Sequence, residues 1–236
     1  MRAASSALIS IAALLTIHAA PASSICPVGR LFFPAVTHAG AETGAVALTF
    51  DDGPDVGLDS FLDVLEAAGA HATFFVVGEQ VERAPNKLEE IVYRGHEVGV
   101  HCYRHRNHLR LTPGQTIEDM LRARAVIEEA AERSVRLFRP PYGIFNTASW
   151  LEASRQRWEH VLWSRWGRDW TSKATPRSVV EEIGMPQAGD VLLLHDSDRY
   201  AAPGSWRATR DALPIIMERI FDLGLQACSV GELLSV

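Results

Sequence analysis

The stretch Thr49-Phe50-Asp51-Asp52-Gly53-Pro54 carries the strongest signal for the fold of this chain. It follows Val46-Ala47-Leu48, a short apolar run typical of a buried strand, and Gly53-Pro54 then turns the chain away. Two adjacent carboxylates at the end of a buried strand repel each other and resist desolvation, so their charge must be compensated. A bound cation is the simplest candidate, although a solvated turn also explains these residues when they are considered alone.

Strand-like and helix-like patterns alternate along the rest of the chain. Apolar residues first show helical spacing at Leu58, Phe61, Leu62 and Leu65, in a helix that we expect to end at Gly69. The predicted strands are 46–48, 73–77, 97–100, 135–138, 161–164 and 191–194. Four more helices are predicted: one contains residues 88–92, two begin at residues 112 and 175, and the last covers 207–223. Pro214 should kink the last helix or delay its start. The alternation predicts an α/β fold, a parallel sheet closed or nearly closed into a distorted (β/α) barrel of about seven strands.

Length and composition favour one domain without a nucleic-acid partner. The 236 residues are 47% hydrophobic and 22% charged, enough for one sizeable core, and α/β barrels of this size form single units. The formal net charge of -6 offers no basic patch for nucleic acid. Three cysteines, Cys26, Cys102 and Cys228, exclude a disulfide scaffold and allow at most one bridge.

Residues 1–22 have the pattern of a targeting segment. Arg2 supplies positive charge, Leu8 to Ile17 is an apolar run, and Ala20-Pro21-Ala22 has the small residues of a cleavage site. The apolar run is short for a membrane span, which favours export and cleavage near Ala22 over an uncleaved anchor. We therefore expect a secreted or cell-envelope protein that contacts a membrane only if this segment is kept. Residues 23–42 would then be a linker or packing arm before a domain over 43–236.

Polar side chains follow the predicted strands at the point where each strand ends. Ligands and catalytic groups of barrels gather at the carboxyl ends of the strands, so these side chains should converge on one rim. They are Asp51 and Asp52 after the first strand, His101 after the third, Arg139 after the fourth, Asp169 shortly after the fifth, and His195 after 191–194.

His101 and His105 have a spacing that places two imidazoles on one side of a turn, where both can bind one metal ion. With Asp52 as an anionic third ligand, the set fits catalytic zinc, which keeps an open position for water. Iron(II) oxygenases use the same ligand types, but their fold is usually all-β. A zincin is unfavoured because Cys102 stands where that motif needs glutamate, and we expect Cys102 to serve packing.

The remaining polar residues fit acid-base chemistry beside such a metal. Asp51 would be free to act as general base towards a water of lowered pKa. His195 could protonate a leaving amine, with Asp169 orienting it, and Arg139 could fix the charge of Asp51. A purely structural ion pair is the competing interpretation for Arg139 and for Asp169.

Five motifs taken in order resemble those of the polysaccharide deacetylase family, the NodB-homology domain of carbohydrate esterase family 4. They are Thr49 to Pro54, His101 to His105, Arg139-Pro140-Pro141-Tyr142-Gly143, Asp169-Trp170 and Leu193-Leu194-His195, within a resemblance that spans residues 43–236. The resemblance implies a distorted β/α barrel that hydrolyses N-acetyl groups of amino sugars in chitin- or peptidoglycan-type polysaccharide and releases acetate. It also implies one divalent metal, usually zinc, with cobalt, nickel or manganese as alternatives.

The resemblance also assigns roles to single positions. Asp51 matches the base and Arg139 the residue that orients it, while Asp169 and His195 match the acid pair. The ligand positions are Asp52, His101 and His105; the Tyr142 backbone N–H matches an oxyanion donor, and Leu193 and Trp170 match the residues that line the pocket for the acetyl methyl group.

The chain departs from the family pattern at three positions. Trp166 stands at the first position of a motif that usually reads Asp-x-x-Asp-Trp, Cys102 replaces a serine or threonine, and Arg106 stands where proline is common. These changes leave every ligand and acid-base position filled, so they bear on substrate preference.

Four of the six tryptophans lie within residues 158–170. Indole rings stack on the apolar faces of sugars, so Trp166 and Trp170 are expected to contact substrate, while Trp163 is expected in the core. Two other functions remain as alternatives: hydrolysis of another linear or cyclic amide, as in allantoinase-like relatives, and a carbohydrate-binding domain without turnover.

Overall fold

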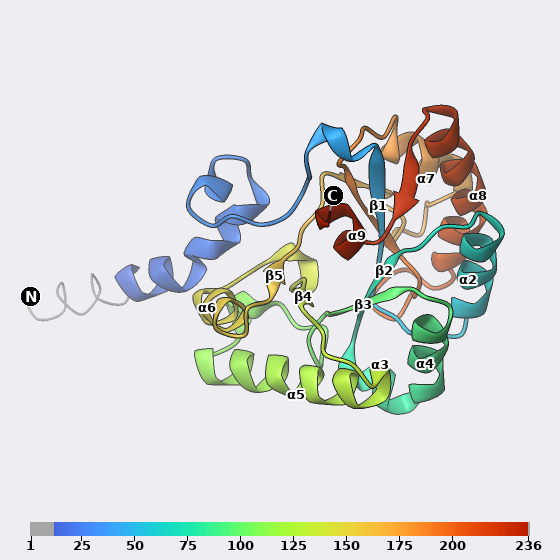
Figure 1. Cartoon of the computed structure of the whole chain (residues 1–236). Coiled ribbons are helices and arrows are strands. Elements are labelled where there is room, and N and C mark those ends of the chain that lie inside the picture. Colours follow the sequence, from blue (N-terminus) through green and yellow to red (C-terminus); the bar gives the residue numbers. More distant parts are fainter. Residues whose placement is uncertain (1–11, 236) are drawn as a thin grey trace, which may run out of the picture.

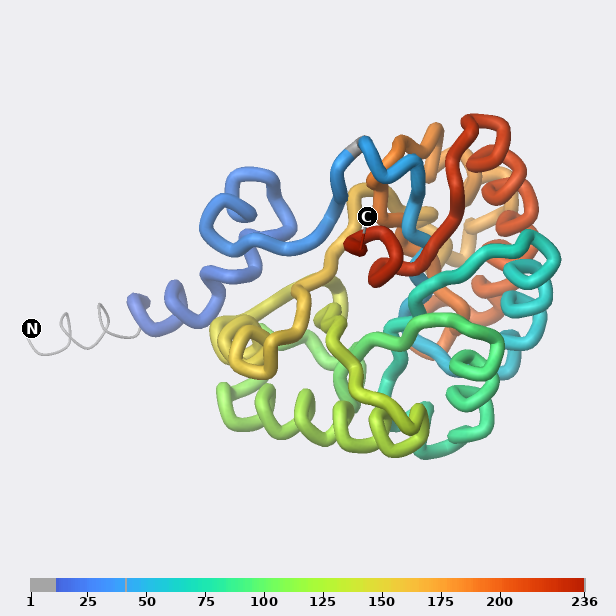
Figure 2. Tube along the Cα trace, in the orientation of Figure 1, coloured from blue at the N-terminus to red at the C-terminus, as the bar shows by residue number. Residues whose placement is uncertain are grey.

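The strand β1 (Ala45–Asp51) lies at the centre of the sheet, and every one of its residues is buried. Such burial on both faces is typical of a parallel sheet covered by helices. The computed structural model describes residues 12–235. Figure 1 shows β1 surrounded by its neighbours, with the helices outside them, and Figure 2 follows the same path as a tube.

The sheet is parallel throughout and confirms the predicted distorted barrel. Seven strands follow the order β5-β4-β3-β2-β1-β7-β6, and an eighth, β8, pairs with the beginning of β1. Besides β1, the strands are β2 (Thr73–Val76), β3 (Glu97–Val100), β4 (Leu137–Phe138), β5 (Glu159–His160), β6 (Arg165–Trp166), β7 (Val191–His195) and β8 (Gln226–Cys228).

The helices cover the outside of the sheet, and their ends follow capping signals in the sequence. In α5 the Thr112 side chain accepts from the Gln115 N–H and the Gln115 side chain accepts from the Thr112 N–H. The described helices are residues 12–19, α2 (Leu58–Ala67), α3 (Gly78–Arg83), α4 (Pro85–Tyr93), α5 (Pro113–Ala131), α6 (Thr147–Arg155), α7 (Pro176–Ile183), α8 (Trp206–Asp222) and α9 (Val230–Leu234). Short 3₁₀ turns are η1 (Ala20–Ile25), η2 (Gly29–Leu31), η3 (Ala41–Thr43), η4 (His108–Arg110) and η5 (Pro141–Gly143).

The predicted strand 161–164 is wrong. This segment crosses from β5, which pairs with β4, to β6, which pairs with β7, and so it spans the gap between the two edges of the sheet. Val161 forms only an isolated bridge, to Val36. The apolar, β-branched composition of the segment reflects its burial in this wall, because burial and strand pairing select the same residue types.

Pro214 does not delay the last helix. α8 begins at Trp206 and continues through Pro214 to Asp222. A proline inside a helix lacks the N–H that would bond to the carbonyl four residues earlier, but Leu213 and Ile216 remain fully buried against the core. Packing of the apolar face therefore outweighs the missing hydrogen bond.

The N-terminal segment packs partly on the barrel. Of the predicted targeting segment, residues 1–11 lie outside the described residues. Val36 bridges to Val161 and His38 to Asp190, so this part of the predicted linker or arm contacts the sheet. None of the helices in residues 12–235 combines the length and apolarity needed to cross a membrane. The three cysteines are free.

The two ends of the barrel differ. α9 closes the end where the strands begin: the Val230 N–H donates to Thr73 Oγ1 and the Gly231 N–H donates to Glu97 Oε2. Thr73 and Glu97 are the first residues of β2 and β3. The opposite end, where the strands finish, is left for the loops that carry the predicted functional residues.

Candidate active site

The structure brings the predicted polar residues together at the carboxyl ends of the strands. Asp51 ends β1 and lies beside His195, which ends β7. His101 directly follows β3, Arg139 directly follows β4, and Asp169 comes after β6. A cavity of about 230 Å³ opens at this point, and it is lined by Asp51, Asp52, His101, His105, Tyr142, Gly143, Trp163, Trp166, Trp170, Leu193, His195 and Tyr200.

Asp52, His101 and His105 form a group whose ligand atoms lie within 4.8 Å of one another. Asp52 Oδ1 is 3.3 Å from His105 Nε2 and 3.6 Å from His101 Nε2. The same Oδ1 atom is buried without a hydrogen-bond partner among the described residues. A buried carboxylate oxygen without a partner is costly, so an anionic atom beside two imidazole nitrogens fits a divalent cation.

The protonation of the imidazoles supports this fit. Burial lowers the pKa of both His101 and His105 to about 3, so both rings are neutral near pH 7. His101 Nδ1 lies 2.7 Å from the Arg139 carbonyl oxygen and donates to it, which leaves the Nε2 lone pair directed towards Asp52. Burial, with the added charges of Asp51 and Asp169, raises the pKa of Asp52 to about 7. A cation would relieve this accumulation of negative charge.

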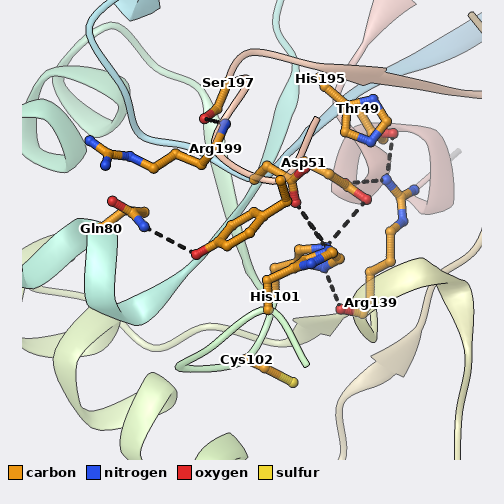
Figure 3. Close-up of polar contacts among 12 residues, drawn as sticks. Thr49, Asp51, Gln80, His101, Cys102, Arg139, His195, Ser197 and Arg199 are labelled. Carbon is orange, nitrogen blue, oxygen red and sulfur yellow. Dashed lines mark hydrogen bonds and ion pairs between the residues drawn. The ribbon is translucent and has the colours of Figure 1, made fainter. Parts of the chain in front are cut away.

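Asp51 is held by a buried arginine. Arg139 is fully buried, and its Nη1 donates to Asp51 Oδ1 at 2.7 Å and to Thr49 Oγ1 at 2.8 Å. Its Nη2 donates to the Leu162 carbonyl oxygen, and its guanidinium lies 4.1 Å from the centre of the Phe75 ring. Figure 3 shows this arrangement from Thr49 to His101. Burial raises the pKa of Asp51, and the charge of Arg139 opposes that rise.

Asp169 and His195 form a second ion pair on the cavity. Asp169 Oδ1 is 2.8 Å from His195 Nδ1, and Oδ2 accepts from the His195 backbone N–H and from Thr209 Oγ1. Burial alone would lower the pKa of His195, but the charge and hydrogen bond of Asp169, with the charges of Asp52 and Asp51, raise it to about 10. His195 is thus protonated near pH 7, and its Nε2 is available to donate.

Aromatic rings form one wall of the cavity. Trp166 and Trp170 meet edge to face at 5.4 Å, and Leu193 lies in the same lining. Trp163 packs partly buried against the core, as expected, and its ring also lines the cavity, where it stacks at 6.1 Å on Trp166. The sequence pattern does not show that Trp163 also reaches the cavity, because the segment 161–164 has the composition of a strand without forming one.

Sequence reasoning missed several residues of the site or assigned them no role. Thr49 and Thr209 hold the two ion pairs by hydrogen bonds, and Tyr200 stacks at 4.4 Å on His105. Asp196, directly after His195, is buried with neither carboxylate oxygen paired among residues 12–235, and burial raises its pKa to about 8. The only available signal was that Asp196 and Tyr200 follow a strand, at the edge where active-site loops gather.

The sequence of this chain matches known proteins over most of its length. Residues 38–160 match the family profile for polysaccharide deacetylases. The chain is 33% identical over 193 residues to a peptidoglycan-N-acetylglucosamine deacetylase of Bacillus cereus, covering 80% of this chain and 87% of that protein. It is 34% identical over 172 residues to a chitooligosaccharide deacetylase of Bradyrhizobium, covering 72% of this chain and 77% of that protein.

The fold agrees with these matches. A crystal structure of a peptidoglycan N-acetylglucosamine deacetylase superposes with a TM-score of 0.78 at 27% identity, covering 84% of this chain and 91% of that one. With the matching profile over more than half of its length, the chain belongs to the polysaccharide deacetylase family.

Proposed function

We propose that this protein is a divalent-metal-dependent hydrolase that removes N-acetyl groups from N-acetylglucosamine residues of a chitin- or peptidoglycan-type polysaccharide and releases acetate. One observation carries the proposal: an unpaired, buried carboxylate oxygen of Asp52 faces two neutral imidazoles, between an Asp51–Arg139 pair and a His195–Asp169 pair. The relatives support the substrate class, because chitooligosaccharides and peptidoglycan share N-acetylated glucosamine.

Asp52, His101 and His105 would hold the cation, with zinc as the expected ion and cobalt, nickel or manganese as alternatives. When bound, such an ion polarises the amide carbonyl and lowers the pKa of a nearby water. Asp51 would take the proton of the attacking water. Arg139 occupies its Oδ1 atom and so leaves Oδ2 to receive that proton.

His195 would act as general acid at the other side of the cavity. Because Nδ1 is bonded to Asp169, the Nε2 proton can move to the departing amine nitrogen. The Tyr142 backbone N–H would bind the oxyanion. Tyr142 has a φ of 61°, rare for a tyrosine and typical of backbone strain held at functional sites.

The cavity lining would select the acetamido group. Leu193 would contact the acetyl methyl, and Trp166 and Trp170 would stack on or beside the sugar ring. We also propose that the protein is exported, to the cell envelope or outside the cell, because these glycans lie there and because residues 1–22 have the pattern of a targeting segment.

The test is release of acetate from chitin oligomers and from peptidoglycan by zinc-loaded protein, compared with Asp51→Asn and His101→Ala. Asp59→Asn and His71→Ala, on the outer surface, are the matched controls. We expect both site variants to lose nearly all turnover while the controls keep it. Wild-type turnover in either site variant would contradict the mechanism.

The same assays separate the two alternative functions. Turnover of allantoin without acetate release would favour the cyclic-amide alternative, and zinc-independent glycan binding without turnover would favour a binding domain.

A further inference from the structure

His105 differs from His101 in how its ring is held. His101 Nδ1 donates to the Arg139 carbonyl oxygen, whereas His105 Nδ1 is buried without a hydrogen-bond partner among the described residues. Metal-binding imidazoles in proteins usually have their second nitrogen fixed by a carboxylate or carbonyl oxygen, which sets the ring orientation. Contacts other than hydrogen bonds must therefore orient the His105 ring.

Two tyrosines enclose that ring. Tyr200 stacks on it with the ring centres 4.4 Å apart and the planes at 16°, and Tyr142 meets it edge on at 4.6 Å and 61°. Tyr142 is 54% exposed at the mouth of the cavity, whereas Tyr200 is half-buried. The ring of Tyr200 lies nearly parallel to the His105 imidazole and so covers one of its faces.

Tyr200 is itself fixed from α3. Its hydroxyl donates to Glu79 Oε1 at 2.8 Å and accepts from Gln80 Nε2 at 3.1 Å, a contact drawn from Gln80 in Figure 3. The loop that carries Tyr200 is tied to the cavity wall, because the Ala202 N–H donates to the Trp170 carbonyl oxygen at 3.0 Å.

We propose that Tyr200 is a positioning residue that orients His105 for cation binding, and that Glu79 acts through Tyr200 in the same way. This inference rests on the proposed function. The stacked ring replaces the hydrogen bond that His105 lacks at Nδ1. α3 and the loop after β7 are distant in sequence, and the hydrogen bonds of the Tyr200 hydroxyl to Glu79 and Gln80 join them next to His105.

The experiment measures zinc affinity of the apoprotein by competition with a chromogenic chelator. Tyr200→Leu removes the stacked ring and should weaken zinc binding by about ten-fold, the usual lower range for residues that orient a ligand. Tyr200→Phe keeps the ring and loses the hydroxyl, so its loss should be clearly smaller. Tyr93→Leu is the matched control: Tyr93 is 86% exposed on α4, and zinc affinity should not change.

Glu79→Ala provides a second variant that keeps the cavity lining intact and guards against misfolding of Tyr200→Leu. Glu79→Ala should weaken zinc binding slightly in the wild-type background. It should have no further effect in Tyr200→Phe, because that variant lacks the hydroxyl that Glu79 binds. Unchanged zinc affinity in Tyr200→Leu, with only KM raised, would overturn the inference and make Tyr200 a substrate contact. Wild-type apoprotein that takes up none of zinc, cobalt, nickel and manganese would remove the proposed function, and this inference with it.

Discussion

Asp169→Asn tests whether the proton of His195 drives the departure of the amine. Asp169 Oδ1 lies 2.8 Å from His195 Nδ1, and this carboxylate is the main group that raises the pKa of His195 from 6.5 to about 10 against the effect of burial. Asparagine keeps the shape and removes the charge. The pKa of His195 should then fall to its ordinary value or below, and the imidazole should lose its proton within the working pH range.

The expected size of the effect depends on pH. With a pKa of 10, His195 is about 90% protonated at pH 9, whereas with a pKa of 6.5 it is about 0.3% protonated there, a ratio of about 300. At pH 6 the protonated fractions of His195 at these two pKa values differ by less than about two-fold. A cation on Asp52 would lower the wild-type value, because Asp52 and Asp51 also raise it, but the contribution of Asp169 remains.

The assay is kcat/KM for acetate release from an acetylated chitooligosaccharide between pH 6 and pH 9. The defect of Asp169→Asn should grow steadily with pH, because the general acid must carry its proton and the variant loses it on the alkaline side. Asp211→Asn, on the surface of α8, is the control and should follow the wild-type profile. Parallel profiles of the wild type and Asp169→Asn across this range would refute the assignment of His195 as the acid.

Three further changes have consequences that can be worked out from the structure. Arg139→Met leaves the carboxylate beside it buried and unpaired, which should cost about 3–5 kcal/mol in urea unfolding, whereas Arg177→Met at an exposed ion pair should change stability far less. Gly53→Ala would place a Cβ against a buried carboxylate oxygen of Asp196 and should lower both Tm and activity, whereas Gly114→Ala meets nothing within 4 Å and should lower neither. Zinc at 100 times its Kd should stabilise the wild type by about 2.7 kcal/mol and raise its Tm, and Asp52→Asn should abolish most of that rise.

Local patterns in the sequence predicted the parts of the fold that local physics determines. The helix beginning at Leu58 follows from helical spacing, since Leu58 and Leu65 are both fully buried, and the start of α5 follows from the capping box at Thr112. The gathering of His101 and Arg139 beside Asp51 was also predictable, because parallel strands all end at the same edge.

The parts that the sequence could not give depend on partners far along the chain. The segment 161–164 has strand composition, but no neighbouring strand is in register with all of it, because it crosses between the edges at β5 and β6. Tyr200 contacts His105 only because the loop after β7 folds across to α3. Neither periodicity nor capping encodes such contacts, so the sequence predicts neither that Trp163 also lines the cavity nor that Tyr200 contacts His105.

Backbone conformation explains why two consecutive aspartates can serve one cavity. Along a strand, successive side chains point to opposite faces, so Asp51 and Asp52 would be separated if β1 continued. Asp52 instead has a φ of 81°, a conformation that asparagine and aspartate tolerate better than most residues, and its side chain lines the cavity together with that of Asp51. Cys102, with a φ of 68°, makes the same kind of turn after His101 and packs in the core while His101 faces the cavity. Each such residue costs of order 1–3 kcal/mol, which the surrounding core must offset. The turn at Asp52 places the proposed base and a proposed metal ligand side by side at the end of one strand.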